Sequence, residues 1–82
     1  MTSARLRVKF TFPPDLIREP VIWRLGRDFR VVTNIRRADV GEDYGWVVLE
    51  LTGEEEEIER GLEWVRSLGV RVDLAEGDVV EG

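Results

Sequence analysis

Residues 44–52, Tyr44-Gly45-Trp46-Val47-Val48-Leu49-Glu50-Leu51-Thr52, decide the fold of this chain. Their aromatic and β-branched content and the period of two predict a strand. One face would hold Gly45, Val47, Leu49 and Leu51, and the other Tyr44, Trp46, Val48 and Glu50. We expect Gly53 to end this strand.

Three further segments are typical of strands. Residues 5–12 (RLRVKFTF) alternate strictly: the apolar residues Leu6, Val8, Phe10 and Phe12 face one way, and the polar ones the other. Pro13-Pro14 ends this strand, because proline cannot donate to a ladder. Residues 31–37 (VVTNIRR) and 70–74 (VRVDL) supply the other two, and residues 38–43 supply a loop.

Two helices are predicted between these strands. The first starts at Glu19-Pro20, with the proline at the first helical position, and its apolar stripe is Val21, Ile22, Leu25 and Phe29. We expect Gly26 to let this helix sit close to the sheet. The second helix covers residues 54–68, and Gly69 occupies the position of a left-handed C-terminal cap.

The resulting order is βαββαβ. It predicts an α+β fold, a ferredoxin-like sandwich in which an antiparallel four-stranded sheet carries two helices on one face. Strands 5–12 and 44–52 take the central places. The expected domain spans residues 1–74, and residues 75–82 form an acidic tail.

Composition restricts the chemistry. The 82 residues include no His and no Cys, which excludes Ser-His and Cys-His nucleophile pairs and zinc or iron–sulfur sites. The run Glu54–Glu57 lacks the ligand spacing of a calcium loop. We therefore expect no catalytic residue, no metal and no cofactor. No apolar run reaches the length of a membrane span, so we expect no membrane partner and a cytoplasmic protein.

Charge is divided along the chain. Residues 1–41 have a net charge of +5 and residues 42–82 a net charge of −10. On the predicted fold the basic residues of the first strand lie on the open face of the sheet, and the acidic excess lies on the second helix and the tail. This separation favours oriented self-association over nucleic-acid binding.

The uncovered sheet face is the predicted interface of a homo-oligomer, a dimer or a tetramer. Its mixture of aromatic, aliphatic and charged groups suits a self-complementary contact. The predicted interface residues are Arg5, Arg7, Tyr44, Trp46, Val48 and Glu50. The alternative partner is single-stranded RNA, since RNA-recognition motifs share this topology. Glu42 and Asp43 stand where such a motif has a cation and a glycine, so nucleic acid is the weaker interpretation.

Three short motifs resemble the NIL domain, one of the ACT-like ferredoxin folds: Glu19-Pro20-Val21-Ile22, Thr33-Asn34-Ile35-Arg36 and residues 45–53. The resemblance extends from about Leu6 to Leu74. NIL domains occur at the C-terminus of methionine ABC-importer ATPases and beside ferredoxin modules. The resemblance implies a sensor, in which methionine binds near a domain interface and lowers transport. It implies that Asn34 contacts the ligand, while Arg36 replaces the leucine of the family.

Two ligand sites follow as alternatives. One is Asn34, Ile35 and Arg36, where Asn34 either binds an amino acid or marks a bulge or strand end. The other is the loop of residues 12–18 before the first helix, with Pro14 and Asp15 as its expected ligand-binding residues. It either binds near a helix N-terminus or is only a rigid loop. Arg36 and Arg37 either hold a carboxylate or protect an edge strand. The predicted function is a non-catalytic regulatory module that binds an amino acid, for which the resemblance implies methionine. The alternatives are an assembly module without a ligand and an RNA-binding domain.

Overall fold

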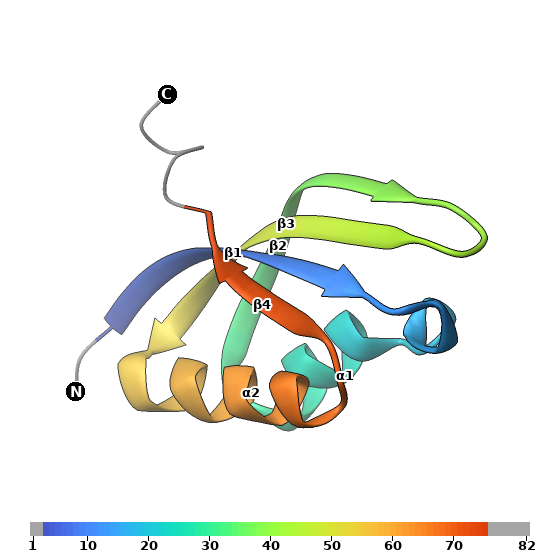
Figure 1. Cartoon of the computed structure of the whole chain (residues 1–82). Coiled ribbons are helices and arrows are strands. Elements are labelled where there is room, and N and C mark those ends of the chain that lie inside the picture. The colour runs from blue at the N-terminus through green and yellow to red at the C-terminus, as the bar shows by residue number, and fades with distance from the viewer. Residues whose placement is uncertain (1–2, 76–82) are drawn as a thin grey trace.

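Four strands and two α-helices follow one another in the predicted βαββαβ order (Figure 1). The structure is a computed structural model that describes residues 3–75. The elements are β1 (Ser3–Phe12), a 3-10 turn η1 (Pro14–Leu16), α1 (Val21–Asp28), β2 (Val31–Val40), β3 (Gly45–Glu54), α2 (Glu55–Ser67) and β4 (Arg71–Leu74). None of the helices within residues 3–75 is long and apolar enough to span a membrane.

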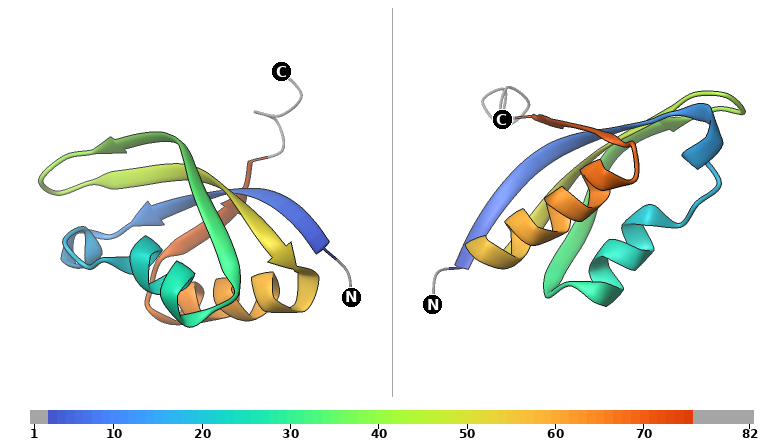
Figure 2. Two further views of the ribbon diagram at one scale, coloured as in Figure 1. Left: turned by 180° about the vertical axis from the view of Figure 1, so that it is seen from behind. Right: turned by 60° about the horizontal axis from the view of Figure 1, so that its bottom comes forward.

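The sheet has the order β2-β3-β1-β4 with all neighbours antiparallel, so β1 and β3 are central as predicted. Both helices cover the same face, and the opposite face is open (Figure 2). The α+β ferredoxin-like sandwich is therefore confirmed.

The core lies between the helices and the apolar faces of the two central strands. The register pairs Leu6 with Leu51, Val8 with Leu49 and Phe10 with Val47, which sets the alternating apolar residues side by side. The largest fully buried side chains are Phe10, Leu25, Leu49, Leu51, Val8, Val21 and Val65.

Element ends differ from the predictions at three places. β2 continues to Val40, because it pairs with β3 in a long hairpin closed by residues 41–44. Pro20 is the N-cap of α1 rather than its first helical residue. β3 passes through Gly53, where a Cβ would lie 2.7 Å from the carbonyl oxygen of Arg30. Gly53 thus allows a close strand approach instead of ending the strand.

Close packing of the helices also involves a different glycine from the one predicted. A Cβ at Gly26 would meet only ordinary contacts, 3.7 Å from the Val31 oxygen. At Gly61 of α2 a Cβ would lie 2.7 Å from Leu25 Cδ1, so Gly61 lets α2 approach α1. The predicted cap is confirmed at Gly69, whose φ is 103° and whose N–H donates to the Arg66 carbonyl at 3.0 Å.

Candidate functional site

An apolar hollow of about 230 Å³ lies on the helix side of the sheet, where α1 begins under the far end of the β2–β3 hairpin. Its lining comes from β1, the β1–α1 connection, the first turn of α1 and the hairpin. The residues are Phe12, Ile17, Glu19, Pro20, Val21, Ile22, Trp23, Val40, Gly45 and Val47.

Local backbone structure shapes this hollow. The η1 turn is closed by a hydrogen bond from the Leu16 N–H to the Pro13 carbonyl, at 2.9 Å, and it directs Ile17 back toward the sheet. Gly45 forms part of the floor, and its lack of a side chain leaves space between Val40 and Ile17. A Cβ there would lie 3.6 Å from Val40 Cγ1 and 3.7 Å from Ile17 Cγ1.

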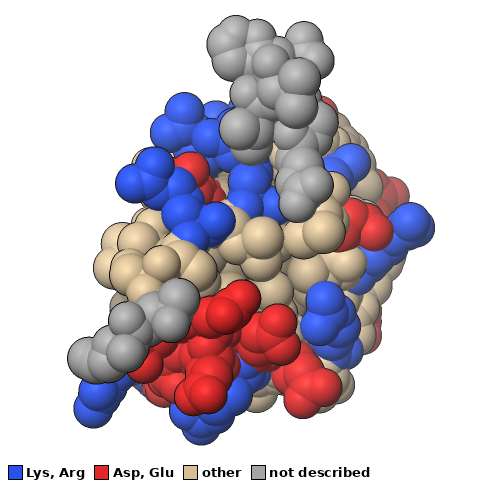
Figure 3. Space-filling model, turned by 90° about the vertical axis from the view of Figure 1, so that its left-hand side faces the viewer, with Lys and Arg blue, Asp and Glu red and all other residues tan. Residues whose placement is uncertain are grey.

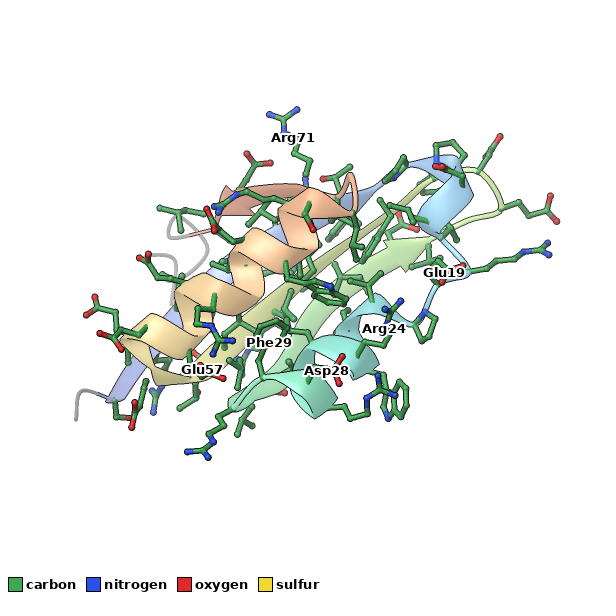
Figure 4. The ribbon with its side chains drawn as sticks, turned by 90° about the horizontal axis from the view of Figure 1, so that it is seen from below. Glu19, Arg24, Asp28, Phe29, Glu57 and Arg71 are labelled. Carbon is green, nitrogen blue, oxygen red and sulfur yellow. The ribbon has the colours of Figure 1, made fainter. Side chains whose placement is uncertain are left out.

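The polar side of the hollow is the start of α1. Figure 4 shows Glu19 just before this helix. The Val21 N–H donates to the Glu19 carbonyl at 2.8 Å, and no side chain caps the helix at Pro20. The first intrahelical hydrogen bond runs from the Arg24 N–H to the Pro20 carbonyl, at 3.0 Å, so the N–H groups of Ile22 and Trp23 have no acceptor within the helix. The rim therefore combines backbone donors, a helix dipole and one carboxylate.

Exposed apolar side chains surround the opening. Trp23 is 59% exposed and Val40 57% exposed, although both are large hydrophobic residues that line the hollow. The Arg27 guanidinium lies over the Trp23 ring, 4.5 Å from its centroid, and covers one ring face only. Apolar surface next to an apolar hollow is typical of a binding site.

The predicted loop site is only partly at this hollow. Pro14 and Asp15 are exposed on η1 and do not line it, whereas Ile17 and Glu19 of the same connection do. Ile17 lies within the predicted loop, residues 12–18, but the sequence does not distinguish it from its apolar neighbour Leu16, which does not line the hollow.

The three residues of the Asn-Ile-Arg motif do not share one location. Asn34 is exposed on the open face, opposite Glu50, and Ile35 is on the helix side, opposite Leu49. The register shifts between Ile35 and Arg37, which leaves Arg36 at a bulge. The regular alternation of side chains is therefore interrupted at Arg36, between Ile35 on the helix side and Arg37 opposite Val48. None of the three lines the hollow.

On the open face, the predicted interface residues are largely engaged within the chain. Arg7 Nη2 lies 3.6 Å from Glu50 Oε2, and the Lys9 ammonium lies 5.1 Å from the centre of the Trp46 ring. Val48 is only 4% exposed, and its register partners on the two neighbouring strands are Lys9 and Arg37. Arg5 remains exposed. The sheet-face interface stays a prediction.

Tyr44 lies in the hairpin loop and not on the strand face where it was predicted. Its hydroxyl donates to Asp39 Oδ1 at 3.2 Å, which raises the pKa of the tyrosine. The Gly41 N–H donates to the Tyr44 carbonyl at 2.8 Å and closes the hairpin. These contacts give Tyr44 a structural role in the turn.

The Glu57 carboxylate, in the first turn of α2, has a structural role away from the hollow (Figure 4). Glu57 Oε2 accepts the backbone N–H of Arg30 at 3.0 Å, and its Oε1 accepts from Arg60 at 2.6 Å. The Arg30 hydrogen bond is the main reason that the pKa of Glu57 lies below its usual value. Within residues 3–75, no three His, Cys, Asp or Glu side chains gather closely enough to hold a metal ion.

Known proteins resemble this chain in fold and in family. Among solved structures it is similar to the C-terminal domain of an ABC transporter ATP-binding protein from Enterococcus faecalis, with 22% sequence identity and a TM-score of 0.73. The match covers 84% of this chain and 81% of that one. No curated protein matches. The family model for the NIL domain matches residues 6–74. The predicted resemblance is confirmed, and the chain belongs to the NIL domain family.

Proposed function

We propose that this chain is a non-catalytic regulatory module of the cytoplasm that binds a small amino acid and acts as a homo-oligomer, with methionine as the first ligand to test. Membership of the NIL family supports this class of function. The single observation that carries the ligand proposal is the apolar hollow beside the start of α1.

The volume and the apolar lining of the hollow fit a single amino acid. Sites for drug-sized ligands have volumes of about 300–1,000 Å³. The hollow, at about 230 Å³, is smaller and suits a ligand of the size of a single amino acid. An unbranched apolar side chain such as that of methionine would contact Phe12, Ile17 and Val47. Its polarizable thioether would also suit the aromatic groups at this site.

The rim has groups of both signs for the backbone of such a ligand. The N–H groups of Ile22 and Trp23 would bind the α-carboxylate at the positive end of the helix. The Glu19 carboxylate would accept hydrogen bonds from the α-ammonium. Asn34, Ile35, Arg36, Pro14 and Asp15 lie outside this lining, so they would act only if a partner copy completed a second site.

Calorimetric titration tests the proposal. Methionine and leucine should bind, and glutamate should not. Gly45→Ala adds a methyl group inside the hollow without a clash and should weaken binding by about 1–3 kcal/mol, or roughly 5- to 150-fold. Gly26→Ala is the matched control and should leave affinity unchanged, because it also adds one methyl but lies outside the lining.

Two results would contradict the assignment. If titration with millimolar methionine or leucine gave no heat while the protein was cooperatively folded, the amino-acid site would be refuted. The chain would then be an interaction module without a ligand. Loss of binding in Asn34→Ala with full binding in Gly45→Ala would move the site to β2. Light scattering tests the oligomer separately, and a monomer would refute that part of the proposal.

A further inference from the structure

The first half of β1 extends beyond its neighbour at the edge of the sheet. β1 pairs with β3 along all ten of its residues, but with β4 only from Val8 to Thr11. One more hydrogen bond, from the Ala75 N–H to the Arg7 carbonyl at 3.0 Å, continues this edge. Residues 3–6 therefore have no strand beside them on this side within the part of the chain that the structure describes.

The direction of the β1 backbone determines which N–H and C=O groups point to this side of the sheet. The Arg7 carbonyl faces β4, and backbone direction alternates along a strand, so the N–H and C=O of Arg5 face the same side. Leu6 instead directs its backbone toward β3. A strand with unpaired donors and acceptors is a template for another strand.

A groove of about 600 Å³ lies below this free edge, between the sheet and α2. Its lining residues are Leu6, Glu59, Arg60, Leu62, Glu63, Arg66 and Leu74. Three leucines form an apolar floor, and Leu74 is 62% exposed because β4 ends there. A strand added beside β1 would place alternate side chains over this floor.

The other face of the same edge is basic. Arg5 and Arg7 project from it on the open side of the sheet, opposite Thr52 and Glu50. In Figure 3, which views the molecule from the side where β1 begins, Lys and Arg gather mainly over the sheet, while Asp and Glu gather below, at the start of α2. The second row of side chains on an added strand would face Arg5, which favours carboxylates.

Neither the sequence that follows Leu74 nor a second copy of β1 has charges that suit this edge. The sequence after Leu74 continues Ala75-Glu76-Gly77, so in a continued register a glutamate would pair with the apolar Leu6 and a glycine with Arg5. If residues 3–7 of a second copy paired antiparallel with residues 3–7 of the first along their full length, Arg5 of one copy would lie opposite Arg5 of the other. Like charges directly opposite each other destabilise a strand pair.

We propose that the first half of β1 and the groove below it bind an extended peptide segment of a partner protein, in which acidic and apolar side chains alternate. The backbone of the segment would pair with Arg5, as in β-strand addition. Its apolar side chains would contact Leu6, Leu62 and Leu74, and its acidic ones would lie beside Arg5 and Arg7. This site is separate from the hollow and does not depend on an amino-acid ligand.

Fluorescence anisotropy with a labelled synthetic peptide, Glu-Val-Glu-Leu-Glu-Val, tests the proposal on the full chain. A peptide of the same composition without alternation, Glu-Glu-Glu-Val-Val-Leu, is the control and should bind at least tenfold more weakly. Arg5→Pro removes the free edge N–H while leaving the bonds between β1 and β3, so it should lower affinity at least tenfold. Arg5→Ala, which removes only the charge, should cost a few-fold and reduce the salt dependence.

Leu74→Glu introduces a carboxylate at an exposed floor position and should also lower affinity at least tenfold. Each variant should keep the wild-type melting curve in the absence of peptide, which separates loss of the site from loss of the fold. Equal binding of the two peptides, or equal affinity of Arg5→Pro and Arg5→Ala, would overturn the proposal.

Two other segments could occupy this edge, residues 76–82 of the same chain or β1 of a second copy, and each predicts a result of its own. Gly77→Pro prevents residues 76–82 from pairing with Arg5 in the continued register, and it should leave peptide affinity unchanged. A tenfold gain would identify this segment as the occupant of the edge. Light scattering of the Arg5→Pro variant should match that of wild type, and a change of mass would instead identify a second copy at this edge.

Discussion

Gly53→Ala should destabilise this protein by far more than an ordinary change of one methyl group in a strand. The new Cβ would lie 2.7 Å from the Arg30 carbonyl oxygen and 3.6 Å from Val31 Cα. Favourable contacts between such atoms need about 3.5 Å or more. The clashing atom belongs to the backbone, so no side-chain rotation relieves the contact.

Movement of Arg30 is also restricted. Its N–H donates to Glu57 at 3.0 Å, and the next residue, Val31, donates to the Phe29 carbonyl at 2.8 Å. Overpacking of this kind costs about 1–3 kcal/mol. The free energy of unfolding of an 82-residue domain is about 4–12 kcal/mol. Gly53→Ala should therefore remove a substantial part of the stability and lower Tm by about 4–8 °C per kcal/mol lost.

Urea unfolding followed by tryptophan fluorescence measures this change. Gly26→Ala is the control, because its Cβ would meet only ordinary contacts. It should stabilise the protein by up to about 1 kcal/mol through helix propensity. If Glu57 holds Arg30 in place, the cost of Gly53→Ala should be smaller in a Glu57→Ala background, which removes the acceptor of the Arg30 N–H. A Gly53→Ala protein as stable as wild type would refute the steric argument, and additivity of the two changes within about 0.5 kcal/mol would refute the role of Glu57.

Two further predictions concern the second helix. Gly69→Ala should cost about 1–3 kcal/mol, because an alanine at a φ of 103° is strained, and thermal denaturation should show a lower Tm with an unchanged helix content. The pKa of Glu57 is lowered in the folded state. Its contribution to stability is therefore present above its ordinary pKa of 4.5, and it is lost as the pH falls through the folded pKa. Glu57→Gln should flatten the dependence of the free energy of unfolding on pH in that acid range, as measured by urea unfolding at several pH values. If the pH dependence of the variant matched that of wild type, other carboxylates would be its cause.

Much of the fold followed from local patterns. The alternation in residues 5–12 and 44–52 predicted the two central strands, and the four-residue spacing of Val21, Leu25 and Phe29 predicted the first helix. These patterns are reliable because each element must bury one apolar face. The ends of the elements were less predictable. Gly53 resembles a strand end in sequence, and only its position against Arg30 shows that the strand passes through it.

The candidate site depended more on contacts between distant segments. The sequence predicts a ligand site in the loop before α1, with Pro14 and Asp15 as its ligand-binding residues, whereas Ile17 and Glu19 line the hollow. Which residues of a loop face a hollow depends on how the η1 turn packs under the hairpin. Likewise, the register shift between Ile35 and Arg37 depends on how β2 pairs with β3, and no local pattern in residues 31–37 marks it.

The sequence by itself determined the order of the elements, their buried faces and the absence of His and Cys from the chain. It also determined the family, because short structural motifs at matching spacing persist in the linear chain. Tertiary structure alone decided where a hollow lies and which strand edge has no partner within residues 3–75. The hollow at Gly45 and the edge at Arg5 arise from the lengths and registers of neighbouring strands. Those depend on packing between residues far apart in sequence, which no local pattern contains.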